Sequence, residues 1–243
     1  MARMTEKITL PSNGLLYNGE IPAELTIQNL TSDEESMLYG SAGDRAIDNI
    51  VKSIVKEDID VNALTVFDRH FILMKGRILT YGPMYPIEVK CNCGNSFHYE
   101  VDLNNLPVYS LESGFENSWD IPKLPQCKKV ISLHIPDGSD MSEMDRIVKR
   151  RCAKYGLIEE RERYKANIAM NIVKIDGEEV APEVALQFVS ELSGMDSSFL
   201  KKEINKLEVG YDTFLTIPCP KCGEDVSLRL PMTADFFRTE FSD

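Results

Sequence analysis

The chain contains two short cysteine motifs that lie far apart in the sequence, Cys-Asn-Cys-Gly at 91–94 and Cys-Pro-Lys-Cys-Gly at 219–223. Each lies between two stretches in which apolar and polar residues alternate, the pattern of a strand with one buried face. The glycine after each second cysteine suits a turn residue at positive φ, because it has no Cβ to clash. Each motif therefore predicts a β-hairpin whose turn carries two thiols.

The two hairpins form an internal repeat. Counting outward from the cysteines, Val89 corresponds to Ile217 and Tyr99 corresponds to Leu228. Two such turns supply four thiolates, which is the complete tetrahedral shell of a structural Zn²⁺. A closed shell of this kind leaves no open position for catalysis at the metal. We therefore predict one structural zinc site, and its ligands are Cys91, Cys93, Cys219 and Cys222.

Other uses of these cysteines stay open, namely a disulfide, a redox pair or buried core thiols. A disulfide between Cys91 and Cys93 would be strained, because only one residue separates them. The first motif is also one residue shorter than the usual Cys-x-x-Cys, so its assignment depends on the repeat. Of the remaining cysteines, Cys152 lies on the apolar face of a predicted helix and is interpreted as a core residue. No role is predicted for Cys127.

The charge of the chain limits its partners. It has 27 Lys and Arg against 39 Asp and Glu, a formal net charge of −12. This balance argues against a general nucleic-acid binder, which must neutralise phosphates, and against binding to an anionic membrane surface. No apolar run approaches the length of a membrane span, so no membrane association is expected. Six cysteines, four of them in turns typical of metal sites, fit a reducing compartment.

The other segments predict a mixture of strands and helices. The strongest helix signal covers residues 61–80, where Leu64, Phe67 and Phe71 begin an apolar face at intervals of three and four. Ser32 and Glu35 predict a capping box at the start of another helix. Strands are also expected at 7–10, 25–27, 130–135 and 172–180, and helices at 44–55, 140–155, 158–169, 182–192 and 197–207, the last of them capped by Asp196.

Three apolar features are candidate contacts for a partner protein. The segment 10–17 has little polar cover, and is either a hairpin packed on the core or an arm that docks on another subunit. The irregular segment 102–127 holds the only tryptophan, and long loops are often functional. The aromatic segment 234–241 is either an anchor on its own core or an exposed contact. The candidate partner-binding residues are Leu15, Tyr17, Trp119, Phe236 and Phe237.

No catalytic constellation is recognisable in the sequence. The three histidines are scattered, and each has a structural explanation. There is no glycine-rich phosphate loop and no defensible Ser-His-Asp pattern. We therefore predict that the protein is not an enzyme and has no small-molecule substrate.

Three motifs in combination resemble a known family. They are Leu-Pro-Ser-Asn-Gly-Leu-Leu-Tyr at 10–17, the first cysteine hairpin with Val-Asp-Leu at 101–103, and the second cysteine hairpin leading to Phe-Phe-Arg at 236–238. Together they resemble the T4-type baseplate protein family of tailed bacteriophages, which includes baseplate hub subunits. The resemblance covers most of the chain in outline, whereas 105–127 carries no match. Asn13 stands where the family is expected to have a basic residue.

The resemblance implies a structural protein, made in the host cytoplasm, that serves in the virion tail baseplate or as a factor in its assembly. Such a protein acts by binding other baseplate and tail proteins. Two alternatives remain. A zinc-ribbon nucleic-acid-binding module would need a basic face, and an enzyme would need a polar cleft with perturbed carboxylates.

The expected fold class is α+β. Residues 1–104 and 209–243 form a core body that contains an N-terminal β-hairpin, helices and a discontinuous zinc ribbon made of two β-hairpin knuckles. Residues 105–208 form a mainly helical subdomain inserted between the knuckles.

Overall fold

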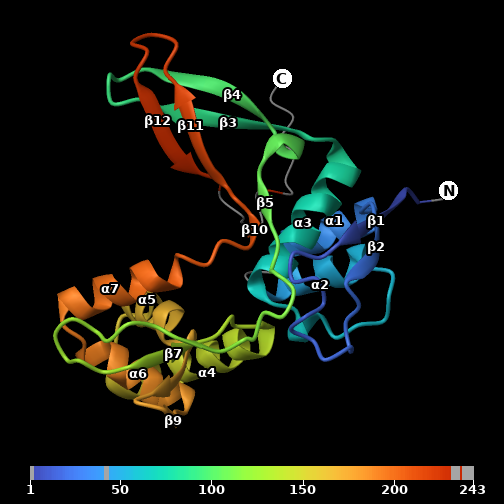
Figure 1. Ribbon diagram of the computed structural model, residues 1–243. Helices are drawn as coiled ribbons and strands as arrows, with labels where there is room; N and C mark the ends of the chain where they lie inside the picture. Colours follow the sequence, from blue (N-terminus) through green and yellow to red (C-terminus); the bar gives the residue numbers. More distant parts are fainter. Residues whose placement is uncertain (1–2, 41–43, 231–235, 237–243) are drawn as a thin grey trace.

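The computed structural model describes residues 3–40, 44–230 and 236 (Figure 1). Helices and small antiparallel sheets alternate along the chain, so the fold class is α+β, as predicted. Two hydrophobic clusters organise the described residues. The first collects residues between Ile8 and Leu106 together with Leu230 and Phe236. The second lies entirely between Ile121 and Leu200. The division of the chain at residues 105 and 208 stays a prediction.

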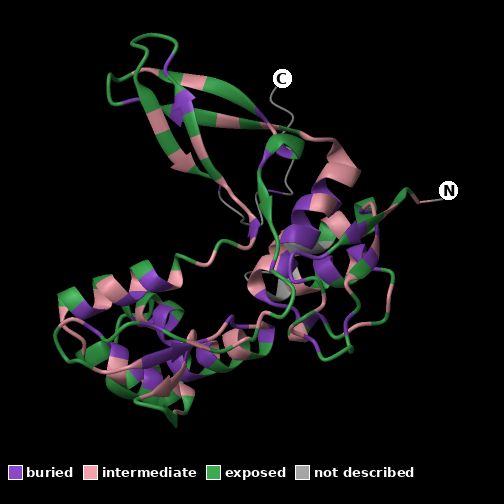
Figure 2. Ribbon diagram, in the orientation of Figure 1, coloured by how far each residue is buried: buried purple, intermediate pink, exposed green. Residues whose placement is uncertain are grey.

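The first cluster lies between an N-terminal hairpin and three helices. Strand β1 (Thr5–Thr9) pairs antiparallel with β2 (Glu24–Gln28), and Ile8 lies opposite Leu25. The helices are α1 (Ser32–Gly40), α2 (Asp44–Ile54) and α3 (Val66–Tyr81). Figure 2 shows the buried residues of this body concentrated around α3. Gly76 of α3 lets α2 approach closely, because a Cβ there would lie 2.4 Å from Ile54 Cδ1.

The predicted helix at 61–80 is interrupted. Residues Val61–Ala63 form a 3₁₀ turn, and α3 begins only at Val66. Between them Thr65 is extended, forms an isolated β-bridge with Asp137, and donates its N–H to the Tyr17 hydroxyl at 3.1 Å. The periodicity of apolar residues spans this break, so the pattern alone could not reveal it.

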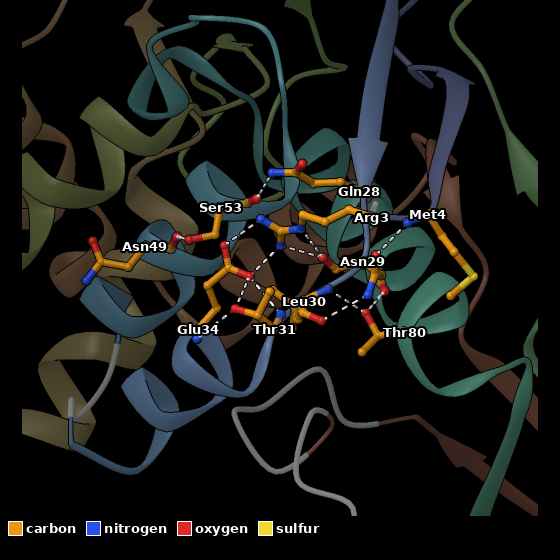
Figure 3. A network of polar contacts seen from close by, with 11 residues as sticks. Arg3, Met4, Gln28, Asn29, Leu30, Thr31, Glu34, Asn49, Ser53 and Thr80 are labelled. Carbon is orange, nitrogen blue, oxygen red and sulfur yellow. Dashed lines mark hydrogen bonds and ion pairs between the residues drawn. The ribbon is translucent and has the colours of Figure 1, made fainter. Parts of the chain in front are cut away.

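The capping box of α1 is shifted by one residue from the predicted position. Thr31 donates its N–H to Glu34 Oε2 at 2.8 Å, and Glu34 donates its N–H to Thr31 Oγ1 at 3.4 Å. The prediction at Ser32 and Glu35 is therefore wrong, although the chemistry is the expected one. Arg3 explains the choice of Glu34, because it bonds both Glu34 and the Asn29 carbonyl and so ties the N-terminal strand to the helix (Figure 3).

Two cysteine hairpins project from this body. Strand β3 (Met84–Lys90) pairs with β4 (Ser96–Asp102), and β11 (Phe214–Pro218) pairs with β12 (Asp225–Arg229), both antiparallel. The hairpins are separate two-stranded sheets whose turns meet at one end (Figure 1). The predicted turn glycines, Gly94 and Gly223, have φ of 83° and 76°. Both hairpins are therefore confirmed.

The second cluster lies between a four-stranded sheet and four helices. The strands, in the order β6-β7-β8-β9, are all antiparallel to their neighbours. Their bounds are Trp119–Asp120, Ile131–Leu133, Ile172–Ile175 and Glu178–Glu179. The helices are α4 (Gly138–Tyr155), α5 (Glu159–Ala169), α6 (Pro182–Glu191) and α7 (Gly194–Ile204).

Helix α7 starts earlier than predicted, and its predicted cap has another task. Ser193 is the N-cap and accepts a hydrogen bond from the N–H of Asp196 at 3.1 Å. Asp196 is buried and accepts from the N–H groups of Gln126 and Cys127 at 2.7 and 3.1 Å. These bonds lower the pKa of Asp196 even though burial opposes ionisation. Asp196 therefore holds the loop that contains Gln126 and Cys127 against α7. The part of Cys127 that makes this contact is its backbone N–H.

The segment that leads into the helices of the second cluster lies beside the segment that leads out of them, and we call the residues between these two segments the helical part. Strand β5 (Val108–Tyr109) follows the first cysteine hairpin and pairs with β10 (Gly210–Tyr211), which precedes the second. A second contact joins the start of α4 to the body, where Gly138 donates its N–H to the Leu64 carbonyl at 3.1 Å. A Cβ on Gly138 would lie 1.8 Å from Arg69, so only glycine permits this approach.

Candidate metal centre

The structure brings the four cysteines of the two hairpins to one place. The sulfur atoms of Cys91, Cys93, Cys219 and Cys222 all lie within 4.8 Å of one another. Cys91 Sγ is 3.6 Å from Cys222 Sγ, and Cys93 Sγ is 3.9 Å from Cys219 Sγ. A tetrahedral zinc with Zn–S bonds of about 2.3 Å places its sulfurs about 3.8 Å apart. The cluster therefore has the size that one zinc ion requires.

The hairpin turns explain why the sulfurs converge. In the first turn, Cys91 donates its N–H to the Asn95 carbonyl at 2.9 Å, and Gly94 donates to the Cys91 carbonyl at 3.0 Å. In the second, Cys219 donates to Glu224 at 2.8 Å and Gly223 donates to Cys219 at 2.9 Å. Both turns thus close over their own first cysteine, and positive φ at the glycine is what lets each chain return.

The electrostatics of the cluster favour a bound cation. Burial opposes ionisation of Cys219, but N–H groups of Cys222 and Lys221 and the neighbouring thiols lower its pKa to about 6. The N–H of Glu224 favours the thiolate of Cys222, yet the partial loss of water around its sulfur and the three nearby thiols raise its pKa to about 12. The first thiolate of the cluster therefore forms easily. Ionisation of a further thiol is unfavourable because two negative charges would then lie close together. A divalent cation removes that repulsion.

The cluster lies at the rim of the fold. Cys91 and Cys219 are buried, whereas Cys93 and Cys222 are exposed. The sulfur of Cys219 also lies 3.7 Å from Asn95 Nδ2, a donor suited to a thiolate. Because protein sulfurs supply four ligands, the arrangement can hold a metal tightly but offers it no vacant position for a substrate.

The segment 10–17 is held against α3 by a buried polar network that the sequence analysis missed. Asp68 is fully buried and accepts hydrogen bonds from the Ser12 N–H, at 3.1 Å, and from the Tyr17 hydroxyl. Burial raises the pKa of Asp68, and burial together with the nearby carboxylate raises the pKa of Tyr17. Tyr17 is thus packed inside this chain, whereas Leu15 is 39 % exposed. The only sequence signal was an acid within the apolar pattern of α3.

Phe236 is anchored in the first cluster. It is 1 % exposed, its ring lies 4.9 Å from that of Tyr85, and its carbonyl accepts from Arg77 Nε at 2.9 Å. The guanidinium of Arg77 also lies over the Tyr85 and Phe236 rings, at 4.6 and 5.1 Å from their centroids. Phe237 lies outside the described residues.

Trp119 is half-buried at the boundary between the two clusters. It lines a cavity of about 280 Å³ together with Phe67 and His70 of α3 and with His134 beside β7. Its ring lies 5.8 Å from that of Phe115. Of the four predicted contacts that the structure describes, Leu15 and Trp119 are accessible to different degrees, whereas Tyr17 and Phe236 are buried.

The pattern of the whole chain matches a known family. Residues 1–238 fit the family described as T4 bacteriophage base plate protein. The chain belongs to this family. The match confirms the resemblance that the sequence motifs indicated. No curated protein and no solved structure matches the chain. Among the described helices, none combines the length and apolar character that a membrane crossing requires.

Proposed function

We propose that this protein is a structural or assembly component of a tailed-phage baseplate hub, and that it acts by binding other tail proteins. Membership of the baseplate family carries the proposal, because the match extends over residues 1–238 and not over one motif alone. Family membership supports a structural role in the phage baseplate. The place in the hub and the mode of action are the finer parts of the proposal.

A zinc clasp is the second part of the proposal. The four cysteines fit one Zn²⁺, which would neutralise two of the four thiolate charges and hold the two hairpin turns together. Residues on the hairpins would then keep fixed positions relative to both hydrophobic clusters. The clasp would thus orient a binding surface without taking part in any reaction.

Complementation of assembly tests the role directly. Extracts of cells infected by a phage that lacks this protein are supplied with purified protein, and complete baseplates are counted by electron microscopy. We expect complete baseplates to appear only in the supplied extract. Quantitative protein analysis of purified virions then separates a retained subunit from an assembly factor. Normal baseplates in the unsupplied extract would refute the proposed role.

A further inference from the structure

The junction between α4 and α5 exposes several large apolar side chains that are close together in the sequence. Nine consecutive residues, 153–161, are all exposed. Among them are three large apolar side chains, Tyr155, Leu157 and Ile158, which are 59 %, 39 % and 54 % exposed. We call these three residues the junction patch. Isolated exposed apolar residues are ordinary, but three large ones exposed within four positions need an explanation.

The junction places an unfavourable residue at the N-cap of α5. Gly156 ends α4 in the left-handed conformation, which is a favourable stop. Ile158 then occupies the N-cap of α5 and makes no side-chain capping bond. Serine, threonine, aspartate or asparagine would satisfy an exposed N–H at this position and would also remove apolar surface. An isoleucine at this position leaves a helix N–H without a capping partner and also exposes apolar surface to water, so it destabilises the fold in two ways. Such local conflicts are typical of functional positions.

Lys and Arg outnumber Glu in the sequence around the junction patch, whereas the chain as a whole is acidic. Residues 146–161 contain six Lys and Arg against two Glu, whereas the whole chain has 27 against 39. Arg150 and Arg151 are paired with Glu183 and Glu162, at 2.5 and 3.4 Å. Lys154 instead lies over the Tyr155 ring, 4.9 Å from its centroid.

Two cations at the edge of the patch have no carboxylate partner within the part of the chain that the structure describes. Among the described residues, neither Lys154 nor Arg161 is in an ion pair, and both side chains belong to the exposed run. A surface that fits the junction patch therefore combines an apolar recess with carboxylates at its rim.

We propose that the junction patch inserts into an apolar recess, rimmed by carboxylates, on another protein of the phage tail. This inference rests on the proposed function. A protein partner can place its carboxylates opposite Lys154 and Arg161 alone. An anionic lipid surface is uniform and would also meet Glu159 and Glu160, which are exposed in the same turn. The local charge pattern therefore favours a protein over a membrane.

One double substitution separates binding from folding. Leu157→Ser with Ile158→Thr removes two apolar side chains and supplies α5 with a capping hydroxyl. We expect its melting temperature to equal or exceed that of the wild type. In the extract complementation assay, we expect half-maximal baseplate formation to require at least about tenfold more protein, because tenfold corresponds to a modest loss of binding free energy.

Two further variants sharpen the test. Lys154→Glu with Arg161→Glu reverses the charges at the edge, and we expect it to weaken complementation most strongly at low salt. Val184→Gln with Met195→Gln is the matched control, because these apolar residues are 52 % and 64 % exposed elsewhere on the helical part. We expect this control to complement like the wild type. Wild-type activity in the patch variant would overturn the inference.

Other occupants give distinguishable results. If the wild type sediments with vesicles of phosphatidylglycerol and phosphatidylcholine and the patch variant does not, the junction patch binds a membrane and not a protein. Patch-dependent dimerisation in analytical ultracentrifugation would replace the protein partner by a second copy of the chain, and either result overturns the inference. If wild-type protein fails to restore assembly, the proposed function itself is refuted. If wild type and patch variant restore it equally, only the inference about the junction patch is refuted.

Discussion

Loss of the metal is expected to loosen the two cysteine hairpins while leaving the rest of the protein folded. The informative substitution is Cys222→Ser, because Cys222 is exposed and its replacement leaves no buried cavity. Cys127→Ser is the matched control, since this thiol is also exposed but lies outside the cluster. We expect one Zn²⁺ per chain in the wild type and the control, and none retained by Cys222→Ser.

The structure sets the size of the effect. Cys93 and Cys219 are 126 positions apart, and closing a free loop of that length costs about 4 kcal/mol. The pairing of β5 with β10 already joins Tyr109 to Gly210, so only roughly 25 residues separate the cysteines along the shorter path, and closure costs about 3 kcal/mol. Release of that constraint corresponds to an opening equilibrium on the order of 100-fold more favourable.

Hydrogen exchange followed by mass spectrometry measures this opening for each segment. We expect the amides of β3, β4, β11 and β12 to exchange on the order of 100-fold faster in Cys222→Ser, because an isolated two-stranded hairpin is only marginally stable. The amides of α3 should exchange as in the wild type, because the first cluster contains none of the four cysteines.

Two results would contradict this reasoning. If α3 and the hairpins lose protection together, the clasp holds the whole fold through the long loop and the β5–β10 pair does not act as a second closure. If metal analysis finds no zinc or other metal in the wild type, the cysteine cluster is not a metal site. An unchanged exchange pattern in a variant that has lost its zinc would show that the metal does not constrain the hairpins.

Three further changes test tertiary contacts in the rest of the fold, each by urea denaturation with circular dichroism. Tyr17→Phe removes a hydrogen bond to buried Asp68 and should cost about 1.5–3 kcal/mol; a loss below that of the exposed Tyr99→Phe would refute a stabilising role for the network. Phe236→Ala should cost about 3–5 kcal/mol, and an effect near zero would show that this residue is not anchored. Gly138→Ala should cost about 1–3 kcal/mol, because the added Cβ collides with a guanidinium; wild-type stability would show that the contact is loose.

Elements with a local signature were predictable from the sequence. The turn at each cysteine motif has its own residues, and both glycines have the expected positive φ. The turn between β8 and β9 contains Asp176 and Gly177, a pair that favours a two-residue hairpin, and α6 starts at Pro182, a residue favoured in the first turn of a helix. The convergence of the four cysteines was predictable because the internal repeat implied two equivalent turns, and a tetrahedral site needs four ligands.

Features that depend on distant partners were not predictable. Glu34 rather than Glu35 closes the capping box because Arg3 reaches it from another element. The break before α3 depends on Tyr17, which arrives from 48 positions away. The sequence predicts Asp196 as an N-cap, yet its carboxylate accepts a hydrogen bond from the N–H of Gln126, 70 positions earlier. In each case the local pattern allowed two neighbouring solutions, and a tertiary hydrogen bond selected one of them.

The composition of the first hydrophobic cluster also determines the order in which the parts of this protein can be completed during synthesis. The buried residues of the second cluster lie between Ile121 and Leu200, and those packed against it lie between Trp119 and Ile204, so all are available before the second cysteine motif is translated. The first cluster needs Leu230 and Phe236 as well as Ile8, and the metal centre needs Cys222. The first cluster therefore contains the residues that are translated first, but it is the last of the two clusters to become complete. Translation that ends before residue 219 would give a chain with a complete helical part but no zinc site, so zinc content would report on chains that were made through to the second hairpin.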